Sequence, residues 1–220
     1  SKAIKHLRDK GKNPKEIKEA LKNNTVLVSI MYANNEIGSI QPIREIAKIV
    51  RDFRKVKKNI YPLFHTDATQ ALNYLDTNIM QLGVQLLSGS GSKIYGTKGA
   101  GFLFAKKDTP MRGIIHGGGQ EHGLRAGTED VTAIVGTGEA LRITNLLKGK
   151  EFERLSKLRD YFHNKLKENF SDCVLNSTSE GLPNIVNVMF PNYESEELVL
   201  RLDAKGISCA GKSACNEGED

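Results

Sequence analysis

Residues 61–70 read YPLFHTDATQ, and residues 84–96 read VQLLSGSGSKIYG. Each stretch begins with a short apolar run and ends in turn-forming residues, which predicts a buried strand that leads into a loop. We expect strands over 61–66 and 84–88. Asp67 would then lie at the carboxyl end of the sheet, where ligands of open α/β folds usually bind.

The flanking sequence extends this alternation of strands and helices. Residues 25–31 (TVLVSIM) predict another strand, and residues 42–55 (PIREIAKIVRDFRK) predict a helix that opens at a proline and has apolar side chains on one side. A short helix over 79–82 and a strand over 101–105 complete the pattern. The first part of the chain therefore predicts an α/β domain with a mainly parallel sheet between helices.

The second part of the chain predicts a different arrangement. Helical patterns cover 132–147 and 151–170, and Gly149 marks a break between them. The remainder predicts an α+β arrangement, with strands over 173–176, 185–190 and 207–209 and a helix over 195–202. We therefore assign residues 1–147 to a larger domain and residues 148–220 to the first part of a smaller one.

Composition and charge exclude several classes of function. The net charge is +6, but the lysines are spread along the chain and partly interleaved with glutamates, so we do not expect nucleic-acid binding as the main function. No apolar run approaches the roughly 20 residues needed to cross a bilayer.

Cys173 is far in sequence from Cys209 and Cys215, which favours a reducing, cytoplasmic compartment over a disulfide framework. Nothing near Cys209 completes a metal-binding set.

Asp67 and Lys93 follow two successive strands and form the most informative pair. Taken alone, Asp67 is typical of a helix N-cap or a turn, and Lys93 is typical of a solvated lysine. Together they fit an enzyme that binds its cofactor as a Schiff base, which needs a lysine at one strand end and a carboxylate facing a pyridine nitrogen on the neighbouring strand. Ser90 and Ser92 could donate hydrogen bonds to a phosphate, although Gly/Ser loops are also common as flexible turns.

Cys215 is the cysteine whose surroundings favour chemistry. Its neighbours are polar, with Lys212 and Ser213 before it and Asn216 after it, which does not fit a small buried hydrophobic residue. A thiolate on a flexible loop can attack a sulfur atom at one place and deliver it at another. Cys173 lies in an apolar strand and is expected to be inert.

Six motifs then occur in the order and approximate spacing of one enzyme family. They are YANNEIG (32–38), HTDATQ (65–70), KIYGTKG (93–99), HGGGQE (116–121), RAGT (125–128) and SAC (213–215). The chain resembles the cysteine desulfurases of the nitrogen-fixation and iron-sulfur-cluster type, within the class V aminotransferases. The resemblance implies pyridoxal-phosphate fold type I, pyridoxal 5'-phosphate as cofactor and a homodimer.

The resemblance also implies a role for each matching residue at the cofactor. Lys93 matches the lysine that binds the cofactor and handles the proton of the substrate α-carbon, and Asp67 matches the partner of the pyridine nitrogen. Ser90 and Ser92 match phosphate contacts. Thr128 matches a threonine that reaches the phosphate bound to the other subunit.

Three further matches concern the substrate and the sulfur. Asn35 and Gln70 match positions near the substrate carboxylate and the phenolic oxygen of the cofactor. Cys215 matches the cysteine of a mobile loop, which takes sulfur from L-cysteine as a persulfide and leaves alanine. The resemblance therefore implies a sulfur-acceptor protein as partner, for iron-sulfur cluster assembly or transfer-RNA thiolation.

Some features depart from the family pattern. Ser92 stands where the family normally has a histidine, although a hydroxyl can still bond to phosphate, and residues 210–212 (AGK) replace a Ser-Ser-Gly-like run. The family's N-terminal phosphate-binding turn, its ring-stacking histidine and its C-terminal arginine are not found. We therefore expect the chain to be part of a longer protein and to have little or no activity in isolation.

Two other functions share part of this pattern. Selenocysteine lyase, or a related β-eliminating enzyme, would use the same Asp67 and Lys93, and alanine release from cysteine compared with selenocysteine would separate the two. A non-catalytic partner of an active desulfurase is the second alternative. Such a partner would have no physical need for Gln70 or Cys215 in addition to that pair.

Overall fold

The computed structural model describes residues 14–211, which form two units that are described here one at a time. The first unit contains the described residues up to Ala33 together with Gln41–Lys150. The second contains Asn34–Ile40 and the described residues from Glu151 onward. The boundary after residue 147 between a larger and a smaller domain stays a prediction.

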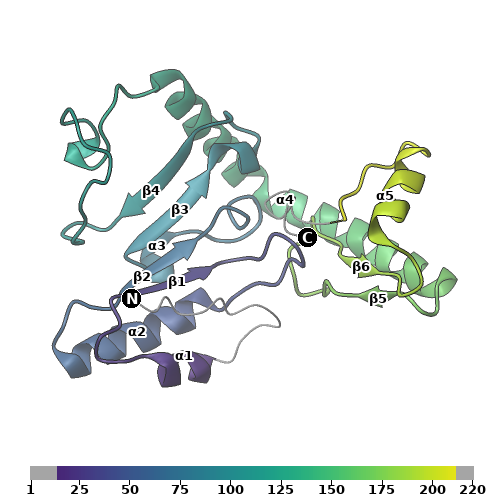
Figure 1. Ribbon diagram of the computed structural model, residues 1–220, viewed down its shortest axis with the longest axis horizontal. Helices are drawn as coiled ribbons and strands as arrows, with labels where there is room; N and C mark the ends of the chain where they lie inside the picture. The colour runs from purple at the N-terminus through teal and green to yellow at the C-terminus, as the bar shows by residue number, and fades with distance from the viewer. Residues whose placement is uncertain (1–13, 212–220) are drawn as a thin grey trace. The chain divides into compact units, whose positions relative to one another are not determined.

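The first unit is built on a four-stranded sheet, whose strands are β1 (Leu27–Met31), β2 (Leu63–Asp67), β3 (Leu86–Ser90) and β4 (Gly101–Ala105). The strands lie in the order β1-β2-β3-β4 (Figure 1). β1, β2 and β3 are parallel, and β4 is antiparallel to β3. The predicted α/β class with a mainly parallel sheet is confirmed.

Two helices pack beside this sheet at its β1 and β2 end. α2 (Ile43–Lys57) packs against β2, and α1 (Pro14–Ala20) packs against α2. The apolar side of α2 is buried, as are Val28 and Phe64, which stand opposite each other in the β1–β2 register. Burial of each such side chain contributes roughly 1.5–3 kcal/mol, so this layer fixes β2 firmly. The short helix α3 (Ile79–Leu82) connects β2 to β3.

Several strand ends differ by one or two residues from the sequence-based limits. β2 extends to Asp67 and β3 extends to Ser90, because Met31, Asp67 and Ser88 are paired across three strands. Asp67 is therefore the last residue of its strand and does not follow it. The sequence placed these ends too early because polar residues there resemble a turn, whereas the ladder hydrogen bonds continue through them.

The helix α4 (Val131–Asn169) is continuous over 39 residues, so the predicted break at Gly149 is wrong. A glycine inside a helix costs only about 1 kcal/mol relative to alanine, which is too little to end so long a helix. Ion pairs on either side of the glycine, Arg142 with Glu139 and Arg154 with Glu151, add support along the helix. No described helix is long and apolar enough to cross a membrane.

The second unit contains the end of α4, two short antiparallel strands and one helix. The strands are β5 (Val174–Leu175) and β6 (Val188–Met189), and the helix is α5 (Ser195–Asp203). The strand predicted over 207–209 is wrong, because the chain turns after α5 and the amide of Ile207 bonds back to the carbonyl oxygen of Leu202 at 3.0 Å.

Candidate functional site

Asp67 ends β2 at the carboxyl edge of the sheet, and its side chain is half-buried. Its carboxylate oxygen Oδ1 accepts a hydrogen bond from the backbone N–H of Thr69 at 2.9 Å. This bond closes a turn directly after the strand and restrains the carboxylate. One neighbour in register is Ser88 of β3. Asp67 thus lies between β1 and β3 in the sheet, at the edge where ligands of such folds bind.

His65 lies two residues before Asp67 and points to the same face of the sheet. Its Nδ1 is 2.7 Å from the hydroxyl of Ser29 on β1, and its Nε2 is 3.2 Å from the hydroxyl of Ser88 on β3. Burial lowers the pKa of His65, and the nearby Asp67 carboxylate partly opposes this by raising it. The imidazole therefore links the three strands β1, β2 and β3.

His65 stands within the HTDATQ motif, but no local sequence pattern indicates its role. Its hydroxyl partners lie 36 and 23 positions away in sequence. The signal that could have found them is the strand register, in which Ser29 stands opposite His65 and Ser88 stands opposite Asp67.

Lys93 lies in a 3₁₀ turn, η1 (Gly91–Ile94), that follows β3 directly. Ile94 is buried and anchors the turn, Tyr95 takes the left-handed conformation at its end, and the Gly96 N–H bonds to the Gly91 carbonyl oxygen at 2.8 Å. The Lys93 side chain is exposed. The sequence therefore folds here into a tight turn that presents an amine at the carboxyl end of β3.

Ser90 and Ser92 lie beside this lysine, one at the end of β3 and one in η1. Their hydroxyl oxygens are 3.1 Å apart, within hydrogen-bond distance of each other. Two hydroxyls at this spacing next to an amine can hold the oxygens of one phosphate. The structure thus places Asp67 at the end of β2, and Ser90, Ser92 and Lys93 at and directly after the end of the neighbouring strand β3.

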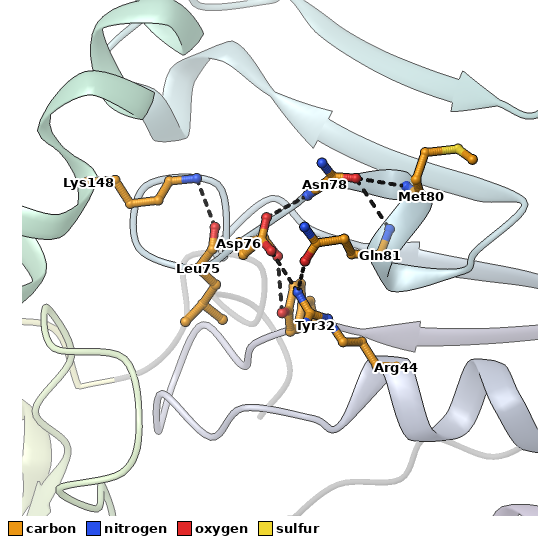
Figure 2. Close-up of polar contacts among 8 residues, drawn as sticks. All are labelled: Tyr32, Arg44, Leu75, Asp76, Asn78, Met80, Gln81 and Lys148. Atoms are coloured by element: carbon orange, nitrogen blue, oxygen red, sulfur yellow. Dashed lines mark hydrogen bonds and ion pairs between the residues drawn. The ribbon is translucent and has the colours of Figure 1, made fainter.

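The segment after Asp67 is anchored on both sides (Figure 2). Arg44 of α2 pairs with Asp76, with its Nη2 at 2.6 Å from Oδ2, and the same nitrogen donates to Gln81. From α4, the Lys148 ammonium donates to the Leu75 carbonyl oxygen at 2.8 Å. Burial lowers the pKa of Lys148, which Asp76 partly offsets. These contacts fix the path of the chain between β2 and α3.

Asn35 belongs to the second unit, in a loop whose geometry is set locally. The Asn34 side-chain oxygen accepts the N–H groups of Glu36 and Ile37, both at 2.9 Å. Gly38 takes a positive φ of 74°, and its carbonyl oxygen accepts the Leu182 N–H at 2.8 Å. The Asn35 side chain is exposed.

The remaining predicted residues lie in different surroundings. Gln70 is half-buried in the turn after β2, close in sequence to Asp67. Thr128 is exposed in the segment before α4, and Cys209 is exposed as well. Cys215 lies outside the described residues.

The residues at the strand ends fit the cofactor that the sequence analysis implies. A pyridoxal phosphate needs an anion for its ring nitrogen, donors for its phosphate and an amine for its aldehyde. Asp67, the hydroxyl pair of Ser90 and Ser92, and Lys93 carry groups of these three kinds at and directly after two neighbouring strand ends. The same set offers no arrangement of three metal-binding side chains, and none was found among the described residues.

The chain matches a known protein family and individual relatives. The family model described as Aminotransferase class-V matches residues 2–217. A cysteine desulfurase IscS of Dictyoglomus turgidum is 45% identical over 93% of this chain and 50% of its own length. One of Clostridium botulinum strain Kyoto is 43% identical over 91% of this chain and 49% of its own length.

A solved structure named as a NifS-like protein superposes with a TM-score of 0.82 at 36% identity, covering 89% of this chain and 52% of its own. The chain thus spans about half the length of the curated relatives it matches.

Proposed function

Because this chain belongs to the class V aminotransferase family, we propose that it is part of a pyridoxal-phosphate-dependent cysteine desulfurase. The enzyme would convert L-cysteine to L-alanine and pass the sulfur to one of its own cysteines as a persulfide. The observation that carries this proposal is the group of Asp67, Ser90, Ser92 and Lys93 at two paired strand ends. The similarity to proteins named cysteine desulfurase supports it.

Four residues of the first unit would hold the cofactor. The carboxylate of Asp67, restrained by the Thr69 N–H, would accept a hydrogen bond from the pyridine nitrogen. The hydroxyls of Ser90 and Ser92 would donate to the phosphate. When bound, pyridoxal phosphate supplies an electron sink that weakens bonds at the α- and β-carbons of the substrate.

Lys93 would have two tasks in turn. Its amine would attach the cofactor, and after release it would take the proton from the substrate α-carbon. Exposure of its side chain at the end of β3 fits a group that must reach both positions. Gln70 would contact the phenolic oxygen of the cofactor.

Three residues would serve the substrate, the sulfur and the second subunit. Asn35 would bind the substrate carboxylate. The thiolate of Cys215 would form a bond to the substrate sulfur as the carbon–sulfur bond breaks, which leaves alanine and a persulfide. Thr128 would donate to the phosphate held by the other protomer of a homodimer.

The persulfide would pass to a sulfur-acceptor protein, for iron-sulfur cluster assembly or transfer-RNA thiolation. The reducing conditions of the cytoplasm would keep the thiols free for this transfer. Cys173 is half-buried beside β5 and would take no part.

The first test is an absorption spectrum of the chain with added pyridoxal phosphate. We expect a visible band that is absent in Lys93→Ala and weakened in Asp67→Asn. Lys98→Ala, an exposed lysine in the following loop, is the matched control and should keep the band. A band that survives in Lys93→Ala would contradict the assignment of this lysine.

The second test measures alanine release from L-cysteine in the full-length protein, with Cys215→Ala as the variant. We expect persulfide formation to be lost in this variant. Faster alanine release from selenocysteine, together with no effect of Cys215→Ala, would favour a selenocysteine lyase instead.

A further inference from the structure

Asn73 connects three separate segments of the first unit through its side-chain amide. Its Nδ2 donates to the backbone carbonyl oxygen of Lys93 at 2.5 Å. Its Oδ1 lies 3.4 Å from the hydroxyl of Thr144 on α4. The amide therefore lies between the turn that carries Lys93 and the middle of α4.

The turn that carries Lys93 also packs closely against α4, so that even a small side chain at either of its glycines would meet the helix. A Cβ atom at Gly91 would lie 2.5 Å from Oγ1 of Thr137, and one at Gly96 would lie 3.0 Å from Cβ of Ala140. Thr137 and Thr144 are two helical turns apart on one side of α4, and both are buried, with 7% and 9% of their surface exposed. The turn thus packs against the buried side of α4.

Asn73 itself is held in place by its neighbours. The Leu72 N–H bonds to the Ala68 carbonyl oxygen at 3.0 Å, which closes the turn that starts at Asp67. On the other side, Leu75 accepts a bond from Lys148, one helical turn after Thr144 on α4. Figure 2 shows this second anchor at Leu75. A short, restrained segment therefore leads from Asp67 to the amide that binds Lys93.

We propose that Asn73 is a positioning residue that fixes the turn carrying Lys93 relative to Asp67, and that Thr144 orients its amide. Lysine has a flexible four-carbon stem, so the position of its amine depends on how firmly its backbone is held. Loss of the bond to the Lys93 carbonyl oxygen would widen the range of amine positions. The catalytic consequence rests on the proposed function, whereas the restraint on the turn does not.

The restraint is tested first by hydrogen exchange on the chain without cofactor. Asn73→Asp keeps the size of the side chain but removes the N–H donor. We expect exchange of the amides in 91–97 to become roughly threefold to tenfold faster, as the loss of one hydrogen bond allows. Asn145→Ala, an exposed asparagine next to Thr144, is the control and should leave this exchange unchanged.

Two substitutions of Thr144 provide a second route if Asn73→Asp folds poorly. Thr144→Val removes the hydroxyl and should speed exchange of the same amides, whereas Thr144→Ser keeps the hydroxyl and should restore the wild-type rate. Unchanged exchange in 91–97 in a folded Asn73→Asp, or equal rates in the two Thr144 variants, would overturn the proposal.

Spectroscopy and kinetics of the full-length protein then test the consequence. In Asn73→Asp we expect the pH dependence of the Lys93-dependent visible band to shift, and kcat to fall by more than KM rises. No visible band in the wild-type protein would contradict the proposed function while leaving the exchange result valid. A wild-type band and kcat in Asn73→Asp would overturn the positioning role.

Discussion

At the scale of single residues, His65 joins three strands of the sheet through its imidazole. It bonds to hydroxyls on both neighbouring strands, and Asp67 follows two positions later on the same face. Burial lowers its pKa despite the nearby carboxylate. The neutral imidazole can donate from one nitrogen and accept at the other, which suits a bridge between two hydroxyls.

This lowered pKa predicts a pH dependence of stability. The unfolded chain takes up a proton at the ordinary histidine pKa of about 6.5, whereas the folded chain resists it, so stability is lost as the pH falls through that value. Above it both states are neutral and His65 makes no pH-dependent contribution.

When the pH falls from about 7.5 to about 5.5, the free energy of unfolding should therefore decrease less in His65→Gln than in the wild type. Urea denaturation at both pH values measures this. The pKa of His163 is also lowered by burial, so His163→Gln should reduce the pH dependence of the free energy of unfolding in the same direction. An equal loss in wild type and His65→Gln would show that His65 does not titrate in this window.

Gly91 is a residue at which the close contact with α4 can be tested. A Cβ atom there would approach Thr137 Oγ1 to 2.5 Å and the Thr97 carbonyl oxygen to 2.9 Å. We expect Gly91→Ala to lower the free energy of unfolding by roughly 1–3 kcal/mol, as overpacking does. Adding Thr137→Ala should recover part of this loss, because it removes one of the two clashing atoms. Thermal unfolding of the single and double variants measures these changes in stability. A Gly91→Ala variant as stable as the wild type would contradict the close contact between Gly91 and Thr137.

Local sequence pattern singled out the candidate cofactor residues but not the residues that support them. Asp67 and Lys93 stand in short motifs directly after apolar runs, so local pattern was sufficient to single them out. Asn73 and Thr144 are 71 positions apart and carry no motif. Their relation depends on how α4 packs, which a local pattern does not contain.

At the scale of elements, α4 shows where local rules mislead. Glycine and the polar sequence around it predicted two helices, but 39 residues form one. Helix propensities are small and are overridden when the residues on both sides are held by packing or by ion pairs. In the first unit each predicted strand exists, because buried apolar runs leave few alternatives, whereas in the second unit the strand predicted over 207–209 does not form.

The same helix yields a prediction at Gly149. No atom lies within 4 Å of a Cβ built there, so alanine would fit without contact. We expect Gly149→Ala to raise the free energy of unfolding by about 0.5–1 kcal/mol, since it removes the entropy cost of a glycine inside a helix. Urea denaturation measures this gain, and Gly138→Ala, equally open on the same helix, should act alike. A loss of stability in both variants would contradict a continuous, open helix at these positions.

A second element-scale feature is the support of the loop that carries Asn35. Arg159 of α4 is buried, with 4% of its side chain exposed, and its Nη1 donates to the Gly181 carbonyl oxygen at 2.9 Å. The next residue, Leu182, bonds to Gly38 in the loop. The loop is therefore built on the second unit, a relation that the sequence did not indicate because the segments are far apart along the chain.

At the scale of the whole molecule, the first half of α4 leaves large apolar side chains exposed. Val135 and Leu146 are 63% and 71% exposed, and Val131 and Ile134 on the same helix are also exposed. Large exposed apolar side chains gathered on one helix can mark a protein–protein contact or a liability to associate. Homodimer formation is part of the proposed function, and this surface offers a direct way to test association.

We expect the chain to self-associate, with a sedimentation coefficient that rises with protein concentration. Val135→Gln should weaken this association, because it removes apolar contact area from an exposed position, and it should leave the free energy of unfolding within about 0.5 kcal/mol of wild type. Thr132→Gln, an exposed polar site one helical turn away, is the matched control and should associate like the wild type. Analytical ultracentrifugation over a range of concentrations measures all three proteins. A wild-type chain that stays monomeric throughout would show that this apolar surface drives no self-association, and the dimer would then require contacts that other surfaces supply.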